Sequence, residues 1–258
     1  MPVVLEARNL NKSFGAVTAA ADINVRVEQD NVVGLIGSNG AGKTTFINMV
    51  TGYLKPTSGS VHYLDREITG MSPRQITQLG ICRSFQIPQL FNTLTVYENL
   101  QVGVDVAARS TREAAVRSGG EAAQIDTLIE RFNLAGYRTQ AAGLLPEGVR
   151  KLLDIAMAVA GRPQVLLLDE PTSGVSADEK FRLMDMVMTA LKAQGVTVLF
   201  VEHDMDIVSR YTQRILAFYE GRIIADGEPN TVLQDTEVRK YVIGEAVHTS
   251  KQAAHGQA

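Results

Sequence analysis

Eight residues between an apolar run and a helical stretch have the types and spacing of a phosphate-binding loop. The segment 37–44 reads GSNGAGKT and directly follows the apolar run 32–36. Its glycines let the backbone turn so that successive N–H groups converge on an anion, and the next helix adds its positive end. Lys43 is placed to reach the outer phosphates of a nucleotide, and the Thr44 hydroxyl to join the shell of a Mg²⁺ ion. The alternative is a glycine-rich turn that matches this pattern by chance.

Two acids end a second apolar run, which covers residues 165–168 and is followed by Asp169 and Glu170. Continuous apolar runs are typical of parallel strands buried on both faces, and ligands of such sheets bind at the carboxyl ends of the strands. Asp169 would there support Mg²⁺ through a water molecule. Glu170 would hold and polarise a water that attacks a phosphate. A surface acid pair that caps a strand is the alternative, and the phosphate-binding loop makes it the weaker one.

Two further residues become functional candidates only because the phosphate-binding loop and the acid pair are present in the same chain. His203 follows a third apolar run, 196–201, which makes it a candidate contact for a terminal phosphate. Gln86 offers a neutral oxygen ligand to Mg²⁺ near the start of the helical region. A single histidine is usually a surface or core residue, and a single glutamine carries no functional signal.

The elements that must position these residues alternate between strand and helix. Short strands are predicted within 4–36 and at 60–63, a turn at 56–59, and a helix from Thr44 to Gly52. The pattern from about 72 to 155 is helical, and strand-helix alternation returns afterwards. The predicted later elements are helices over 96–108, 112–133, 150–160 and 178–194, strands at 165–168 and 196–201, and a hairpin over 214–225.

Length, composition and charge limit the classes of protein to which this chain can belong. With 258 residues and 45% apolar residues, the chain is long enough for one α/β unit with sub-domains. The net charge of −3 argues against a nucleic-acid partner. Cys82 is the single cysteine, which fits a reducing compartment and a buried apolar role. The N-terminus is charged too early for a signal peptide, and no apolar run reaches the roughly 20 residues of a membrane span. We therefore expect a cytoplasmic protein whose membrane role comes through a partner.

In this order, the motifs resemble the nucleotide-binding subunit of ABC transporters over almost the whole chain. The segment 12–15, KSFG, is similar to the one whose aromatic residue stacks on adenine. The resemblance implies that ATP and Mg²⁺ bind and that ATP is hydrolysed. It assigns catalysis to Glu170, His203 and Lys43, and the metal to Thr44, Gln86 and, through water, Asp169. It assigns ATP contacts to Phe14, Gly37, Ser38, Asn39, Gly40, Ala41, Gly42, Lys43, Thr44, Thr45 and Gln86.

The resemblance also implies the fold and the partners. It implies an α/β P-loop NTPase fold, with a RecA-like core, an antiparallel β-subdomain and a helical subdomain near 87–158. One nucleotide-binding domain would cover 1–244, and 245–258 would be a disordered tail. The partners would be integral-membrane permease subunits and a second ATP-binding subunit. The chain would then lie in the cytoplasm, peripheral on the inner face of the cell membrane.

Three stretches, 90–100, 202–206 and 238–245, resemble the ATP subunits of branched-chain amino-acid uptake systems. Subunits for other solutes share these stretches, so another transported solute remains an alternative. A soluble ABC-type ATPase of an assembly system uses the same motifs and is a second alternative. A DNA-repair member would need a long coiled coil between Gln86 and Asp169. A P-loop kinase or GTPase would not explain Gln86 and His203 in this order.

The chain departs from the family at the signature loop, usually LSGGQ. The corresponding residues are Leu145, Pro146, Glu147, Gly148 and Val149. In the family, this loop grips the γ-phosphate bound to the other subunit. Pro146 has no N–H to offer, and Glu147 brings negative charge toward an anion. An asymmetric heterodimer is therefore our hypothesis, in which a partner supplies the standard loop. A homodimer in which Gly148 and the helix N-terminus suffice is the alternative. Ser176 also stands where the family commonly has aspartate.

Overall fold

The computed structural model describes residues 1–110 and 120–244 and contains two β-sheets. The larger sheet has six strands in the order β10-β9-β3-β8-β7-β6. These are β3 (Val32–Gly37), β6 (Ile81–Ser84), β7 (Val165–Asp169), β8 (Thr197–Val201), β9 (Arg214–Tyr219) and β10 (Arg222–Gly227). Neighbouring strands from β9 to β6 pair in parallel, and β10 joins β9 as an antiparallel hairpin. Every residue of β7 and β8 is buried, as their apolar runs predict.

The smaller sheet is antiparallel and has the order β2-β1-β4-β5. Its strands are β1 (Val3–Phe14), β2 (Val17–Glu28), β4 (Ser58–Tyr63) and β5 (Arg66–Glu67). The helix α1 (Lys43–Val50) shares one hydrophobic core with both sheets. Phe46 and Ile47 of α1 are fully buried in that core, which fixes the start of the helix at the end of β3.

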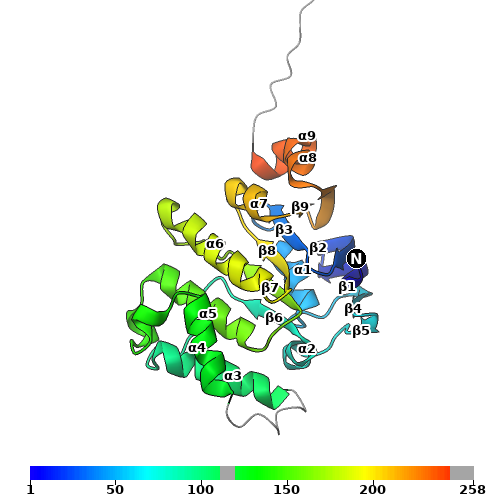
Figure 1. Cartoon of the computed structure of the whole chain (residues 1–258). Helices are drawn as coiled ribbons and strands as arrows, with labels where there is room; N and C mark the ends of the chain where they lie inside the picture. Colours follow the sequence, from blue (N-terminus) through cyan, green and yellow to red (C-terminus); the bar gives the residue numbers. More distant parts are fainter. Residues whose placement is uncertain (111–119, 245–258) are drawn as a thin grey trace, which may run out of the picture.

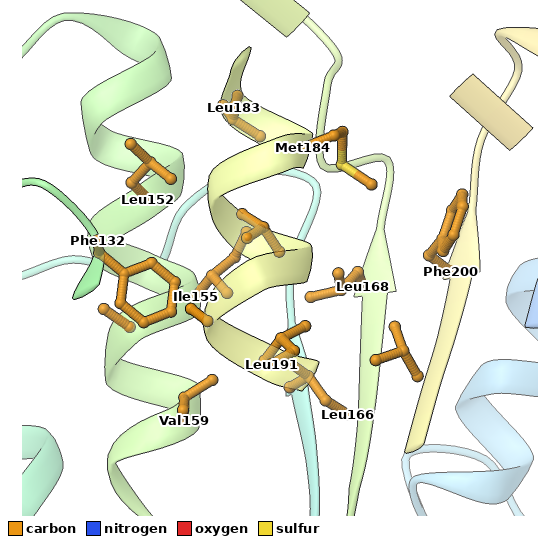
Figure 2. Close-up of a cluster of buried hydrophobic side chains, with 14 of the residues drawn as sticks. Phe132, Leu152, Ile155, Val159, Leu166, Leu168, Leu183, Met184, Leu191 and Phe200 are labelled. Carbon is orange, nitrogen blue, oxygen red and sulfur yellow. The ribbon is translucent and has the colours of Figure 1, made fainter. Parts of the chain in front are cut away.

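Four longer helices lie together in Figure 1: α3 (Val96–Ser110), α4 (Glu121–Arg131), α5 (Glu147–Ala160) and α6 (Ala177–Lys192). The helices α5 and α6 pack on the other face of the large sheet, and α3 and α4 pack on α5. Figure 2 shows how α5 joins the large sheet to the helices α3 and α4. Its side chains Leu152, Ile155 and Val159 lie between Phe132, which directly follows α4, and α6 with its sheet strands. Residues 145–149, which correspond to the signature loop, therefore lie at the start of a helix that packs both on the large sheet and on the helices α3 and α4.

The remaining elements are short. They are α2 (Pro73–Leu79), α7 (Met205–Tyr211), α8 (Pro229–Gln234), α9 (Thr236–Val238), the π-helical turn η4 (Arg239–Ile243), and the 3₁₀ turns η2 (Ala135–Tyr137) and η3 (Ala142–Leu144). Ser72 caps α2 through a capping box with Gln75, and Gly80 ends it with φ 107°. Within the described residues, no helix has both the length and the apolar character needed to cross a membrane.

The predicted α/β fold with an antiparallel sheet is confirmed, and one part of the sequence pattern is wrong. The stretch 72–155 was expected to be helical, but β6 lies within it as the edge strand beside β7. Four residues are too few to show a strand period, so pairing with β7 decides their conformation. The predicted helix 112–133 falls partly outside the described residues; its described part is α4. The predicted tail, 245–258, also lies outside them.

Candidate functional site

The phosphate-binding loop lies between β3 and α1, where the sequence predicts it. Gly42 precedes α1 with φ 107°, and a Cβ there would lie 2.9 Å from the Ala19 carbonyl oxygen. Only glycine fits that conformation and that close approach. No side chain caps α1, so the N-terminal end of the helix faces the loop. The backbone geometry thus matches a site for a phosphate group.

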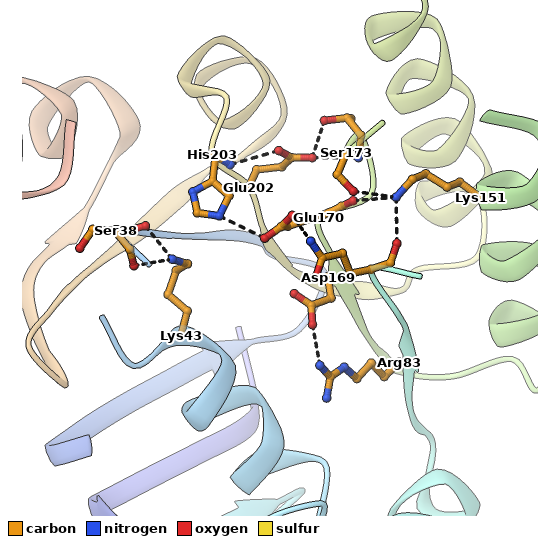
Figure 3. A network of polar contacts seen from close by, with 12 residues as sticks. Ser38, Lys43, Arg83, Lys151, Asp169, Glu170, Ser173, Glu202 and His203 are labelled. Atoms are coloured by element: carbon orange, nitrogen blue, oxygen red, sulfur yellow. Dashed lines mark hydrogen bonds and ion pairs between the residues drawn. The ribbon is translucent and has the colours of Figure 1, made fainter. Parts of the chain in front are cut away.

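Lys43 is buried and folds back over the loop, as Figure 3 shows. Its Nζ donates to the carbonyl oxygens of Gly37 at 2.6 Å and Ser38 at 3.1 Å. Burial lowers the pKa of Lys43, while the charges of Glu170 and Asp169 oppose that shift. An ammonium group held by neutral carbonyls can exchange them for phosphate oxygens, whose negative charge pairs with it.

The loop, Glu170 and His203 converge on one small cleft. The cleft has a volume of ≈110 Å³ and is lined by residues 39–45 together with Glu170, Val201 and His203. β7 and β8 are neighbours whose residues Asp169 and Val201 pair, so the side chains that follow the two strands meet at one sheet edge. Predicted residues from three separate segments therefore lie around one space.

Glu170 holds the centre of this arrangement. Its Oε2 accepts a hydrogen bond from Gln86 Nε2 at 2.7 Å, and its Oε1 lies 3.1 Å from His203 Nε2. The backbone of Glu170 is left-handed with φ 49°, an uncommon conformation for a non-glycine residue. In this structure Gln86 thus contacts a carboxylate, while the sequence predicts a metal contact for it.

Asp169 forms a buried ion pair that the sequence analysis missed. Arg83 Nη2 donates to Asp169 Oδ2 at 2.5 Å, and Arg83 Nη1 donates to Asn48 Oδ1 at 2.7 Å. The Arg83 guanidinium also lies 4.9 Å from the centre of the Phe85 ring. Since β6 pairs with β7, the side chain of Arg83 reaches across to the end of the neighbouring strand. The Asp169 carboxylate therefore already has a cation beside it.

The donor set fits Mg²⁺. The Thr44 hydroxyl, the Gln86 amide oxygen and the Asp169 carboxylate are oxygen ligands, which Mg²⁺ prefers. In the described part of the chain, no cluster of three or more His, Cys, Asp or Glu side chains forms a metal cage. Mg²⁺ commonly takes part of its oxygen shell from water and from substrate phosphates, which is compatible with this donor set.

The comparisons with known proteins agree with this geometry. The family model described as "ABC transporter" matches residues 20–173. The chain belongs to the ABC transporter family. It is 35% identical to the high-affinity branched-chain amino acid transport ATP-binding protein BraF of Pseudomonas aeruginosa, over 94% of this chain and 98% of that protein. It is 32% identical to the protein LivG of Escherichia coli K12, with the same two coverages.

Solved structures show the same fold. The ATP-binding cassette MJ1267 of an ABC transporter superposes with a TM-score of 0.82 at 31% identity, covering 93% of this chain and 98% of that one. CbiO1 of Clostridium perfringens, part of the ABC transporter complex cbiONQ, gives a TM-score of 0.81 at 28% identity, with coverages of 93% and 94%. The two sheets and the helices of this chain are thus those of an ABC ATP-binding cassette.

The signature-like residues of this ABC cassette begin α5, outside the lining of the loop cleft. Pro146 occupies the N-cap position and Glu147 the first helical position. Arg150 Nε lies 3.9 Å from Glu147 Oε2 and the same guanidinium donates to the Ala142 carbonyl at 2.8 Å. Leu145 is buried, and Gly148 and Val149 are half-buried. A partly exposed carboxylate therefore stands at the start of α5, where the family carries a glycine.

The role of Phe14 stays a prediction, and Ser176 stays a departure from the family pattern. Phe14 is 53% exposed at the end of β1, with Lys12 Nζ 4.9 Å from its ring centre, and it does not line the cleft. Ser176 precedes α6, and its hydroxyl donates to Glu179 at 2.7 Å. An exposed aromatic at this edge is available for stacking on a base.

Glu202 and Lys151 are buried polar residues that sequence reasoning missed. Glu202 accepts from the N–H and hydroxyl of Thr172, at 2.9 and 2.5 Å, and from the N–H of His203 at 3.1 Å. It therefore ties the loops after β7 and β8 together. Lys151 of α5 points toward Glu170 (Figure 3). Both sit beside a recognised motif in the sequence, and that position was the available signal.

Proposed function

We propose that this chain is the ATP-hydrolysing subunit of an ABC transporter that imports branched-chain or related amino acids through a partner permease. The observation that carries the enzymatic part is the convergence of the loop with Lys43, Glu170 and His203 on one cleft. The solute class is supported by the names of the relatives BraF and LivG. The domain would cover 1–244, with a helical subdomain near 87–158.

The reaction would be in-line attack of water on the γ-phosphate of ATP. The loop N–H groups and the positive end of α1 bind the phosphates, and Lys43 exchanges the Gly37 and Ser38 carbonyls for phosphate oxygens. Thr44, Gln86 and, through water, Asp169 would hold Mg²⁺, which neutralises charge on the phosphates. Glu170 orients the attacking water, and His203 holds the γ-phosphate. Phe14 would stack on the adenine.

Gln86 and His203 hold the Glu170 carboxylate in place. Its Oε2 accepts from Gln86, and its Oε1 lies beside His203. Each carboxylate oxygen can accept two hydrogen bonds, so acceptor positions remain on this group for the attacking water. The two neighbours would therefore orient the carboxylate for its proposed role.

The Glu170→Gln variant tests this function. An amide cannot accept the proton of the attacking water, so turnover should fall on the order of 10²–10⁴-fold while ATP still binds. Phosphate release and the dissociation constant of a fluorescent ATP analogue should be measured on the same preparation. Turnover near that of the wild type would remove Glu170 from the role proposed for it.

We infer that the permease docks in a groove beside Gln86. The groove has a volume of ≈520 Å³ and lies between the β6 edge and the helices α3 and α5. Its lining includes the exposed aromatic residues Tyr53 and Phe91, and Phe85 and Gln89 on either side of Gln86. An apolar helix end of a membrane subunit would fit this lining, and movement there would reach Gln86 directly. The chain would then be peripheral on the inner face of the membrane.

Membrane fractionation separates this proposal from a soluble assembly ATPase. The chain should sediment with membranes only when its permease is co-expressed. Phe91→Asp, which places a charge in the groove, should release it while ATP binding persists. Sedimentation that is independent of the permease would contradict the docking site, and a chain that stays in the supernatant with every permease would favour the assembly role.

We further propose an asymmetric pair of ATP subunits. Glu147 would bring a carboxylate to the phosphate bound by the partner, and Pro146 has no N–H to replace it. The site completed by this loop would therefore hydrolyse ATP slowly, while the site on this chain is completed by a partner. The glutamate that orients the attacking water should be substituted in each subunit in turn, and the two variants should lose unequal amounts of ATP turnover. Equal losses would contradict the asymmetry.

A further inference from the structure

A lysine of the signature helix reaches the backbone of two loops at the active site. Lys151, in the second turn of α5, is only 3% exposed. Its Nζ donates to the carbonyl oxygen of Glu170 at 3.0 Å, to that of Gln86 at 3.2 Å, and to the Ser173 hydroxyl at 3.1 Å. The ammonium group has three N–H donors, and the structure supplies three acceptors from two loops. The side chain is thus fully committed to holding those loops.

The surroundings of Lys151 are acidic and poorly hydrated. Burial lowers the pKa of this ammonium group, and the charges of Glu147, Glu202, Asp154 and Glu170 oppose that shift. Two of these four carboxylates belong to α5, and two to the loops after β7 and β8. The lysine is therefore the cation shared by α5 and the edge of the sheet.

The backbone of Glu170 depends on contacts of this kind. Its φ of 49° is a conformation that a non-glycine residue keeps only when its surroundings determine it. The Glu170 N–H donates to the Val201 carbonyl at 3.0 Å, and its own carbonyl accepts from Lys151. One contact fixes the residue to the sheet and the other fixes it to α5.

A second side chain of the same helix holds the segment around Gln86. Asp154 lies three residues after Lys151 and accepts from the N–H of Phe85 at 3.3 Å and of Gln89 at 2.8 Å. Both flanks of Gln86 are therefore bonded to α5. A shift of this helix would move Gln86 and the Glu170 backbone together.

We propose that Lys151 is a positioning residue for ATP hydrolysis, which sets the Glu170 carboxylate by fixing its backbone to the signature helix. The inference rests on the proposed role of Glu170 toward water. It makes turnover depend on where α5 lies, and hence on whether the partner subunit has closed on this helix. Because Lys151 does not line the cleft of the phosphate loop, ATP binding is independent of it.

The test measures the full chain assembled with its permease and second ATP subunit. Lys151→Met removes all three donors and keeps the length of the side chain. A displaced reacting group costs on the order of 10²-fold, so kcat should fall about 10- to 100-fold while KM stays within about threefold. Lys151→Arg, which keeps the charge and donors, should recover part of kcat. Lys151→Gln, with two donors, replaces the methionine variant if that one does not fold, and should lower kcat at least about threefold.

Two controls separate positioning from general stability. Lys192→Met removes an exposed lysine at the end of α6 and should leave kcat unchanged. Val232→Ala destabilises the chain through a buried side chain of α8, away from α5, so it should lower the unfolding temperature and leave kcat intact below it.

The outcomes distinguish the two proposals. If Glu170→Gln hydrolyses ATP as fast as the wild type, the role of Glu170 itself is refuted. Turnover that depends on Glu170 but remains within twofold in Lys151→Met would refute the inference about Lys151 alone. An equal kcat loss in Val232→Ala at matched destabilisation would also refute it, because the lysine would then be only structural.

Discussion

Removing Arg83 should leave a buried carboxylate without a partner. In the wild-type chain the side chains of Arg83 and Asp169 are only 9% and 12% exposed, and their closest atoms are 2.5 Å apart. Arg83→Met keeps much of the side-chain volume and removes the charge. Since the carboxylate stays behind, the variant loses the attraction and keeps the desolvation cost of the remaining charge. We expect a large loss of stability in the absence of Mg²⁺.

The magnitude follows from the burial of the pair. Breaking a buried ion pair at one partner costs about 3–5 kcal/mol. For a chain of this size, about 2–4 °C of melting temperature corresponds to each kcal/mol, so the variant should melt roughly 6–20 °C lower. Arg138→Met is the matched control, since Arg138 also pairs with a carboxylate and lies 4.6 Å from the Tyr97 ring centre, but is 42% exposed. An exposed pair contributes about 0–1 kcal/mol, which predicts a fall of at most about 4 °C.

Thermal unfolding is measured with ATP and EDTA, and again with ATP and Mg²⁺. A divalent cation beside Asp169 should replace the lost guanidinium charge, so Mg²⁺ should raise the melting temperature of Arg83→Met more than that of the wild type. If Arg83→Met melts within 2 °C of Arg138→Met without Mg²⁺, the argument from the buried charge fails. If Mg²⁺ stabilises both proteins equally, Asp169 is not near the bound metal.

Four further outcomes are expected. Lys43→Ala should weaken ATP binding itself, measured as the dissociation constant of a fluorescent analogue, and an unchanged value would contradict the proposed exchange of carbonyls for phosphate oxygens. Burial raises the pKa of Cys82 to about 11, so iodoacetamide at pH 8 should label the thiol only after denaturation. Asn99 is fully buried and bonds to Phe91 N and O, so Asn99→Ala should cost about 1–3 kcal/mol in urea unfolding. The double change of Pro146→Ser with Glu147→Gly should raise total turnover of the assembled pair, and an unchanged rate would support a tolerated loop.

The sequence predicts those parts of the site that local spacing determines. The loop before Lys43 follows a buried strand, and so do Glu170 and His203. Since β7 and β8 are adjacent parallel strands, residues just beyond them must meet at one edge. The strand runs and the motif order therefore suffice to bring these three side chains together, and in the structure all three line one cleft.

Contacts that depend on pairing between distant segments could not be predicted. Arg83 reaches Asp169 only because β6 lies beside β7, and β6 is a four-residue strand inside a stretch with a helical pattern. Lys151 follows Arg150 in a charged pair of the kind that usually faces solvent. The packing of α5 against both the sheet and the other helices turns Lys151 inward, and no period in the sequence records that second interface.

The three buried or half-buried cations of the site hold different kinds of partner, and this difference implies separate steps. Lys43 contacts neutral carbonyls, so phosphate oxygens can displace them with a gain in charge pairing. Arg83 contacts a full carboxylate, so a metal ion must compete with an existing charge there. Lys151 contacts backbone oxygens that move only with their loops. Binding of ATP would therefore respond to Lys43, the metal to Arg83, and the final placement of Glu170 to the helix that carries Lys151. A variant at each position should then fail at a different stage of one catalytic cycle.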